Sequence, residues 1–189
     1  MRNKVLIILV VGFLSQILIS CCKCGDSFTF ENIYTGVTVI PYDNSGFAPK
    51  IAIDTVYKNA FGLGVLVNFE SKPYANHFYL SLGFDAAMAC DCIGDEFIYP
   101  DPISHMEIFM INQMNGQNLN VTDHFQIYGY TGELMTLDDF FVQRQSWHDG
   151  FQIELVKHDS IPMSAIFSAE VFFKSGKSFI GQTTIVNFY

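Results

Sequence analysis

The sequence predicts an all-β fold, an antiparallel β-sandwich of immunoglobulin-like type with one short amphipathic helix. Apolar and polar residues alternate with a period of two over several segments, as they do in half-buried strands. Phenylalanine occurs 19 times while charged residues make up only 15% of the 189 residues, a composition that suits a large core. Helical spacing of apolar residues marks the segment Thr136–Trp147. A closed β-barrel is the alternative architecture.

The start of the chain has the features of a lipoprotein signal peptide. Two basic residues precede a nearly continuous apolar run, Val5–Leu14, and the small residue Ser20 stands directly before Cys21. This order is that of a secretory signal, and the cysteine makes it resemble the bacterial lipobox, whose cysteine carries acyl chains such as palmitate. We therefore expect residues 1–20 to be removed and Cys21 to be the lipid-attachment site. A membrane-spanning helix needs about 20 apolar residues, and Ser15-Gln16 interrupts this run.

The mature chain is expected to hold one domain. A tether over residues 21–27 leads into a β-sandwich domain over residues 28–189, a size that can bury a single core. Loss of the basic residues Arg2 and Lys4 takes the formal net charge from −9 to −11. Negative charge of this size argues against nucleic acid, or an anionic membrane surface, as a partner.

The strands are expected in order along this domain. Alternation is clearest in four segments: Phe61–Glu70, Phe78–Met88, Phe167–Phe173 and Phe179–Phe188. It is weaker in five others: Phe28–Tyr34, Ile51–Tyr57, Ile103–Ile111, Phe125–Tyr130 and Phe151–Val156. A Ser175-Gly176 turn separates the last two clear strands, and glycine supplies the positive φ that tight hairpins need.

One helix is expected near residues 137–146. Thr136 is placed to cap its N-terminus, Asp138 and Asp139 lie in its first turn, and Arg144 lies near its last. This order of charges complements the helix dipole. The apolar face of this helix would cover an open end or edge of the sheets.

Four cysteines remain in the mature chain after Cys21. They form two Cys-x-Cys pairs, Cys22 with Cys24 and Cys90 with Cys92. Residues two positions apart in a strand have Cα atoms about 6.6 Å apart, which is near the upper limit for a disulfide. Each pair is therefore better suited to bonding elsewhere than to forming a disulfide within itself. Disulfides from tether to strand end, free thiols and a zinc site are the three alternatives, and the spacing is short for structural zinc.

The sequence contains no recognisable catalytic or cofactor motif. The five histidines lack a His-Glu-x-x-His pattern and a Gly-x-Ser-x-Gly nucleophile turn, and no phosphate-binding glycine loop occurs. The pair His148-Asp149 and the acidic loop Asp91–Asp101 are the only polar candidates for a site, and the favoured interpretations are a helix-ending turn for the pair and a solvated connection for the loop. We therefore expect no metal site and no cofactor.

Aromatic side chains are candidates for sugar recognition. Exposed tyrosine or tryptophan can serve as a stacking platform, although such rings also lie half-buried at sheet margins. The candidates are Tyr74, Tyr79, Tyr99, Tyr128, Tyr130 and Trp147.

Taken together, several segments resemble small uncharacterised lipoproteins of gut-dwelling Gram-negative anaerobes, which are grouped as a domain of unknown function. The segments that carry the resemblance are Leu18–Cys24, Cys90–Cys92, Ile103–Asn112, Asn118–Phe125 and Lys174–Phe179. The resemblance implies anchoring in the outer membrane and a β-sandwich, with no established activity. Lys23 partly matches the signal for surface display, which leaves the surface and the periplasmic orientation open.

The resemblance also implies a modification. Such bacteria O-glycosylate exported proteins at triplets of aspartate, a hydroxyl residue and an apolar residue. Asp54-Thr55-Val56 and Asp159-Ser160-Ile161 fit this pattern, so Thr55 and Ser160 are candidate glycosylation sites.

Two classes of function remain open. A non-enzymatic binding module of the cell envelope, with a glycan, a peptide or a partner protein as ligand, is favoured because sandwich domains commonly carry recognition in their end loops. The alternative is a hydrolase of envelope or other polymers whose site is assembled from distant residues.

Overall fold

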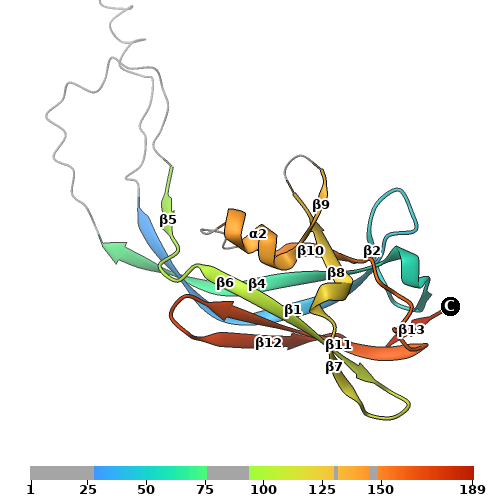
Figure 1. The fold of residues 1–189 in the computed structure, drawn as a ribbon. Helices are drawn as coiled ribbons and strands as arrows, with labels where there is room; N and C mark the ends of the chain where they lie inside the picture. The colour runs from blue at the N-terminus through green and yellow to red at the C-terminus, as the bar shows by residue number, and fades with distance from the viewer. Residues whose placement is uncertain (1–27, 76–93, 130–131, 145–148) are drawn as a thin grey trace, which may run out of the picture. The chain divides into compact units, whose positions relative to one another are not determined.

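The computed structural model describes residues 28–75, 94–129, 132–144 and 149–189 (Figure 1). The chain divides into two compact units, Met1–Glu31 with Ser71–Ile98 and Asn32–Glu70 with Tyr99–Tyr189. The expected strand Phe78–Met88 and all five cysteines lie outside the described residues. The signal peptide, the tether and a single domain over 28–189 stay predictions.

The smaller unit contributes a short parallel strand pair. Strand β5 (Glu96–Ile98) pairs with the first residues of β1 (Thr29–Asp43). The rings of Phe30 and Phe97 stack with centroids 5.6 Å apart, and Oδ1 of Asp95 accepts a hydrogen bond of 3.0 Å from the backbone N–H of Phe28.

The strands form two open sheets. The first has the order β2-β1-β4-β10-β8-β9, with β5 added beside β1. Its further strands are β2 (Lys50–Ile51), β4 (Phe61–Ala75), β10 (Phe151–Leu155), β8 (Phe125–Tyr128) and β9 (Leu134–Thr136). The second has the order β3-β13-β11-β6-β7, with β12 beside β11. Its strands are β3 (Thr55–Val56), β13 (Val186–Phe188), β11 (Ser164–Phe173), β6 (Ile103–Asn112), β7 (Asn118–Asn120) and β12 (Ser178–Gln182).

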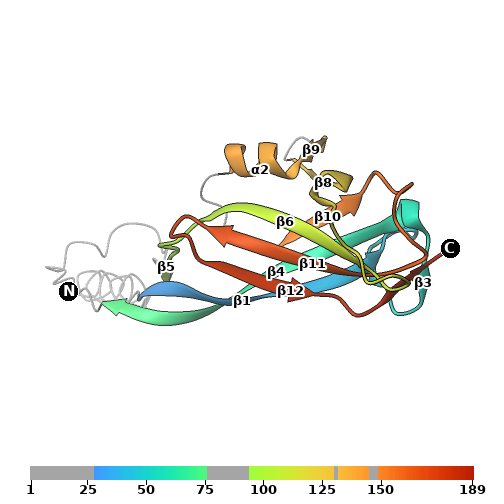
Figure 2. The same cartoon turned by 60° about the horizontal axis from the view of Figure 1, so that its bottom comes forward.

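Pairing within the sheets is mostly antiparallel. Strand β11 lies between β6 and β12, and Figure 2 shows the three side by side. The hairpin from β11 to β12 turns through Gly176, whose φ is 85°, as the Ser175-Gly176 pattern predicted. Two pairs are parallel, β1 with β5 and β3 with β13, so both sheets are mixed.

The core of the larger unit lies between the inner faces of the two sheets. Every second residue of β11 is buried, as period-two alternation requires, and Phe61, Leu63, Val65 and Val67 are buried on one face of β4. Gly62 and Gly64, which alternate with them, are buried as well. The ring of Phe167 on β11 lies 5.0 Å from that of Phe61 on β4 and 5.9 Å from that of Phe125 on β8. These contacts join one sheet to the other, so the all-β sandwich is confirmed. Because both sheets are open over the described residues, the barrel alternative is wrong.

The single described α-helix, α2 (Leu137–Gln143), covers the sandwich on one side. It contacts β6 of one sheet and β8 and β9 of the other. Its buried Phe141 meets Phe151 of β10 edge-on at 5.3 Å. Thr136 is the N-cap, since its Oγ1 accepts a hydrogen bond of 3.1 Å from the backbone N–H of Asp139. The cap and the apolar face agree with the sequence, but the helix ends at Gln143, short of the expected residue 146, and Arg144 is its C-cap rather than part of its last turn.

Several strand boundaries differ from the expected ones. Strands β1 and β4 continue well beyond Tyr34 and Glu70, and the expected strand Phe179–Phe188 is divided into β12 and β13. The division falls at Thr183. Its side chain replaces a backbone carbonyl as acceptor, because Oγ1 accepts a hydrogen bond of 3.1 Å from the backbone N–H of Phe167. In the described part of the chain no helix is long and apolar enough to cross a membrane.

Candidate functional site

The polar residues singled out in the sequence do not converge in the described structure. His148 and Asp91 lie outside the described residues. Oδ1 of Asp149 accepts a hydrogen bond of 2.7 Å from the backbone N–H of Gly150, which is the local turn expected after the helix. Asp101 holds the β11–β12 turn, where its Oδ1 accepts a hydrogen bond of 2.8 Å from the N–H of Ser175. Among the described residues no group of three or more His, Cys, Asp or Glu side chains could hold a metal ion.

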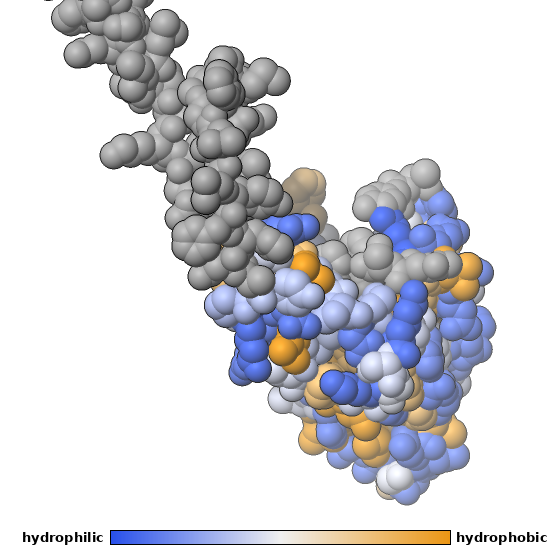
Figure 3. Space-filling view, turned by 90° about the vertical axis from the view of Figure 1, so that its left-hand side faces the viewer, coloured by the Kyte–Doolittle hydropathy of each residue, from blue (hydrophilic) through white to orange (hydrophobic). Residues whose placement is uncertain are grey.

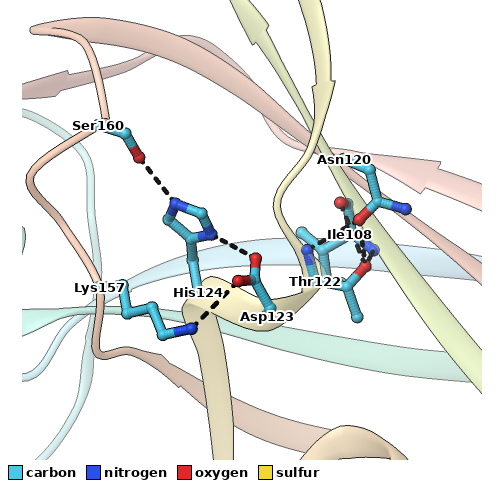
Figure 4. Close-up of polar contacts among 7 residues, drawn as sticks. All are labelled: Ile108, Asn120, Thr122, Asp123, His124, Lys157 and Ser160. Atoms are coloured by element: carbon cyan, nitrogen blue, oxygen red, sulfur yellow. Dashed lines mark hydrogen bonds and ion pairs between the residues drawn. The ribbon is translucent and has the colours of Figure 1, made fainter.

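A polar cluster that the sequence analysis did not single out lies beside the 3₁₀ turn η3 (Thr122–His124). The cluster comprises Asp123, His124, Lys157 and Ser160 (Figure 4). We refer to the chain Asp123–His124–Ser160 as the relay. Two of its members come from η3 and one from the loop between β10 and β11, 36 positions further along the chain.

Hydrogen bonds to Thr122 fix η3 on the second sheet. Its Oγ1 accepts a hydrogen bond of 2.8 Å from the backbone N–H of Ile108 and donates one of 2.7 Å to Oδ1 of Asn120. The same Oδ1 accepts a hydrogen bond of 3.0 Å from the N–H of Thr122. This Asx-type turn holds the 3₁₀ turn against β6 and so sets the position of His124.

The β10–β11 loop is fixed against the same turn. The carbonyl oxygen of His124 accepts hydrogen bonds of 2.8 Å and 3.2 Å from the N–H groups of Val156 and Lys157. A tight turn then forms, in which the N–H of Ile161 donates to the carbonyl of His158 at 3.2 Å. Lys58 Nζ donates to the carbonyl of Ile161 and holds the end of this turn. Ser160 is thus presented on an anchored turn, with its side chain exposed.

The relay is continuous from carboxylate to hydroxyl. Nδ1 of His124 lies 2.7 Å from Oδ1 of Asp123, and Nε2 lies 2.7 Å from Oγ of Ser160. An ionised carboxylate can only accept, so Nδ1 carries a proton. In the neutral imidazole Nε2 then has a free lone pair, which can accept from the Ser160 hydroxyl.

Lys157 forms an ion pair with Asp123 in this cluster. Its Nζ lies 3.1 Å from Oδ2 of Asp123. The hydrogen bond from Lys157, followed by that from His124, lowers the pKa of the Asp123 carboxyl below its ordinary value. Because a lowered pKa favours the ionised form, Asp123 stays an acceptor for Nδ1 at neutral pH. Asp123 and Lys157 are both largely exposed, so this ion pair contributes little to global stability.

A pocket of about 400 Å³ borders the relay, within the range of small-molecule sites. Asp123 of the relay and Lys157 of the same cluster both belong to the pocket lining. The lining comprises Asn120, Thr122, Asp123, Phe125, Gln126, Thr136, Leu137, Asp138 and Lys157. The polar side chains of this lining supply two carboxylates, two amides, two hydroxyls and one ammonium, while apolar atoms make up the larger part of the pocket surface.

A second pocket lies on the other side of Asp138, between α2 and β6. Its volume is about 520 Å³ and it contains a second serine–histidine pair, Ser104 and His105. Oγ of Ser104 lies 3.0 Å from Nδ1 of His105, but this hydroxyl also donates to the carbonyl of Phe172 at 3.0 Å. The imidazole of His105 stacks on the Phe172 ring with centroids 4.3 Å apart. Unlike His124, it is held by an aromatic ring rather than by a carboxylate.

The candidate aromatic platforms are dispersed. Tyr74 and Tyr128 are about half exposed, whereas Tyr99 packs edge-on against Phe69 at 5.9 Å. Tyr79, Tyr130 and Trp147 lie outside the described residues. Tyr57 and Tyr189 form a paired platform that no sequence pattern indicated: their rings lie 4.9 Å apart on the surface, where the neighbouring strands β3 and β13 end.

Exposed apolar residues do not by themselves identify a site. On the face drawn in Figure 3, hydrophobic residues are interspersed with hydrophilic ones over the described part of the surface. Scattered apolar exposure of this kind is normal for a protein surface. The pocket beside the relay is therefore the stronger candidate, because polar groups from three segments converge there.

The candidate glycosylation sites differ in their surroundings. Thr55 lies on β3, where it pairs with Asn187 of β13 and is partly buried. Ser160 is exposed, but its hydroxyl is already bonded to His124. The Asp123-His124 dipeptide is visible in the sequence, yet nothing local to it points to a serine so far along the chain.

Comparison with protein-family models, with curated proteins and with solved structures found no match.

Proposed function

We propose that this chain is a lipid-anchored binding module of the outer membrane. We further propose that the pocket of about 400 Å³ beside the relay binds a glycan. The observation that carries the glycan assignment is the lining of that pocket. Sugar hydroxyls both donate and accept, so a site that binds them needs both kinds of group. The carboxylates of Asp123 and Asp138 accept, Lys157 donates, and the amide of Gln126 does both.

The position of these groups supports the same proposal. They come from η3 with the start of β8, from the first turn of α2 and from the β10–β11 loop. The cap at Thr136 and the Asx-type turn at Asn120 hold two of these segments by hydrogen bonds, so the lining is ordered before a ligand arrives. A preformed site loses less conformational entropy on binding than a flexible one.

The anchor is supported by the sequence alone. The basic start, the apolar run and Ser20-Cys21 are the features of a lipidated export signal. A single acyl chain holds a protein only weakly, so stable anchoring needs more than one chain on Cys21. A module held at the membrane in this way would present its pocket to glycans of the envelope or of the surroundings.

A glycan array probed with the detergent-extracted full chain tests the binding proposal. We expect binding to a restricted set of glycans. Gln126→Ala should weaken it about 3- to 10-fold, because a hydrogen bond of roughly 0.5–1.5 kcal/mol is lost. Gln152→Ala is the matched control, since Gln152 is an exposed glutamine on neighbouring β10 that does not line the pocket. No glycan bound, or equal binding by both variants, would contradict the proposal.

A further inference from the structure

We infer that the Asp123–His124–Ser160 relay is a hydrolytic centre for small carboxylic esters, with Ser160 as the nucleophile and His124 as the general base. The two hydrogen bonds of 2.7 Å link the three side chains in the order that this chemistry needs. The inference goes beyond glycan binding and does not depend on it.

The two hydrogen bonds assign the roles when the neutral imidazole is the reacting form. The Asp123 carboxylate accepts from Nδ1–H and so holds the imidazole in the tautomer whose Nε2 is free to take a proton. Ser160 Oγ is the only other group bonded to this ring among the described contacts, and it faces that nitrogen at 2.7 Å. Asp123 and Lys157 do not meet the substrate in this scheme, so they are positioning residues.

Hydrogen bonds of the surrounding backbone hold the side chains of the relay in position. Two N–H groups of the β10–β11 loop bind the carbonyl of His124 itself, which ties the serine loop to the residue that carries the base. The Lys58 contact to Ile161 closes the same turn from the other side. A nucleophile and base held within hydrogen-bond reach need no rearrangement before reaction.

The reaction balances without a cofactor. Oγ of Ser160 attacks the ester carbonyl carbon and its proton moves to Nε2 of His124. The carbon–oxygen bond to the leaving group breaks, and the Nε2 proton passes to the departing alkoxide to give an alcohol. Water then attacks the acyl-serine, His124 takes its proton and returns it to Oγ, and a carboxylic acid leaves. The net change is ester plus water to alcohol plus acid.

Exposure limits the expected rate. Ser160 lies on the surface, so water solvates the oxyanion that forms when the carbonyl is attacked. The acceleration must then come mainly from the general base, which contributes about 10²- to 10⁴-fold. Asp123 belongs to both the relay and the lining of the proposed glycan pocket, but His124 and Ser160 do not line that pocket, so the substrate class is a small ester that reaches Ser160 from solvent.

The test uses p-nitrophenyl acetate and a fluorophosphonate probe with the purified full chain. We expect release of p-nitrophenolate above background and probe attachment at Ser160, located by peptide mass spectrometry. Ser160→Ala and His124→Ala should each remove the hydrolysis, a fall of about 10²- to 10⁴-fold. Ser104→Ala is the matched control, because it removes the serine of the other serine–histidine pair and should leave the rate unchanged.

The role of Asp123 has its own readout. An asparagine amide can donate to Nδ1, which would put the proton on Nε2 and block acceptance from Ser160. Asp123→Asn should therefore lower the rate of fluorophosphonate labelling, and Asp123→Glu should restore it in part. A merely structural role would not separate these two substitutions in this way.

Several results would overturn the inference. They are a hydrolysis rate unchanged in Ser160→Ala, no label on Ser160, or an O-glycan on Ser160 in protein from the native host, which would occupy the reacting oxygen. Absent hydrolysis with intact glycan binding defeats this inference alone. Hydrolysis without glycan binding defeats the proposed function alone.

Discussion

At the scale of single residues, polar groups inside the sandwich are placed where the backbone ladder needs them. Thr183 is buried at the break between β12 and β13. Its N–H donates to the carbonyl of Phe167 at 2.8 Å, and its Oγ1 accepts from the N–H of the same residue at 3.1 Å. Phe167 is fully buried, so water cannot replace this acceptor. The Thr183 hydroxyl therefore provides a hydrogen-bond partner for the buried Phe167 N–H of β11 at the point where the neighbouring strand β12 ends.

Replacing Thr183 with valine keeps the shape and removes the acceptor. We expect Thr183→Val to lower the free energy of unfolding by about 1–3 kcal/mol, because the Phe167 N–H is left buried without a partner. The matched control is Thr184→Val, at the exposed neighbouring position, which should change stability by less than about 0.5 kcal/mol. Urea unfolding of both variants measures the difference, and equal stabilities would contradict the role assigned to Thr183.

At the scale of elements, α2 shows how a short helix is held by its cap and its packing together. Isolated helices of this length are unstable in water. Here Leu137, Phe140 and Phe141 are buried, and Thr136 both accepts from the Asp139 N–H and donates to its carboxylate at 2.7 Å. The first turn of α2 also supplies Thr136, Leu137 and Asp138 to the pocket. The cap therefore links the stability of the helix to the shape of the site.

Removing the cap should weaken the helix and the pocket together. We expect Thr136→Ala to cost about 1 kcal/mol of unfolding free energy, since the Asp139 N–H loses its acceptor. Thr136→Ser keeps the hydroxyl and should stay within a few tenths of a kcal/mol of the native chain. Hydrogen exchange at the N–H groups of α2 gives a local measure. Equal exchange in the two variants would show that packing alone holds the helix.

At the scale of the whole molecule, the proposed lipid anchor is a prediction about attachment to a membrane. The described residues contain no helix suited to crossing it, and the apolar run at the N-terminus is interrupted by Ser15-Gln16. We propose that acyl chains on Cys21 join the chain to the bilayer, as the Ser20-Cys21 pattern predicts.

Substitution of two adjacent cysteines separates the anchor from other thiol chemistry. We expect Cys21→Ala to abolish acylation and leave the chain without diacylglycerol mass. Cys22→Ala should keep both the acyl mass and membrane retention, because only the residue after the cleavage site is modified. Membrane fractionation followed by intact mass spectrometry decides between them. An acylated Cys21→Ala variant, or a mature chain that begins elsewhere, would refute the lipoprotein proposal.

Sequence alone determined what depends on local periodicity. Alternation in Phe61–Glu70 and Phe167–Phe173 predicted strands because a pleated strand turns every second side chain to the core. The spacing and charges after Thr136 predicted the capped helix for the same kind of reason. The signals for β7 and β9 were too short to detect, since three residues cannot establish a period.

Only the tertiary structure decided what depends on residues far apart in the chain. Pairing of the strands into two open sheets excluded the barrel, because the same alternation serves either architecture. The relay brings His124 to Ser160 across 36 positions, through hydrogen bonds between η3 and the β10–β11 loop. Hydrophobic period is a property of neighbours along the chain, whereas a site of this kind is a property of neighbours in space. For that reason the sandwich could be predicted from the sequence and its candidate site could not.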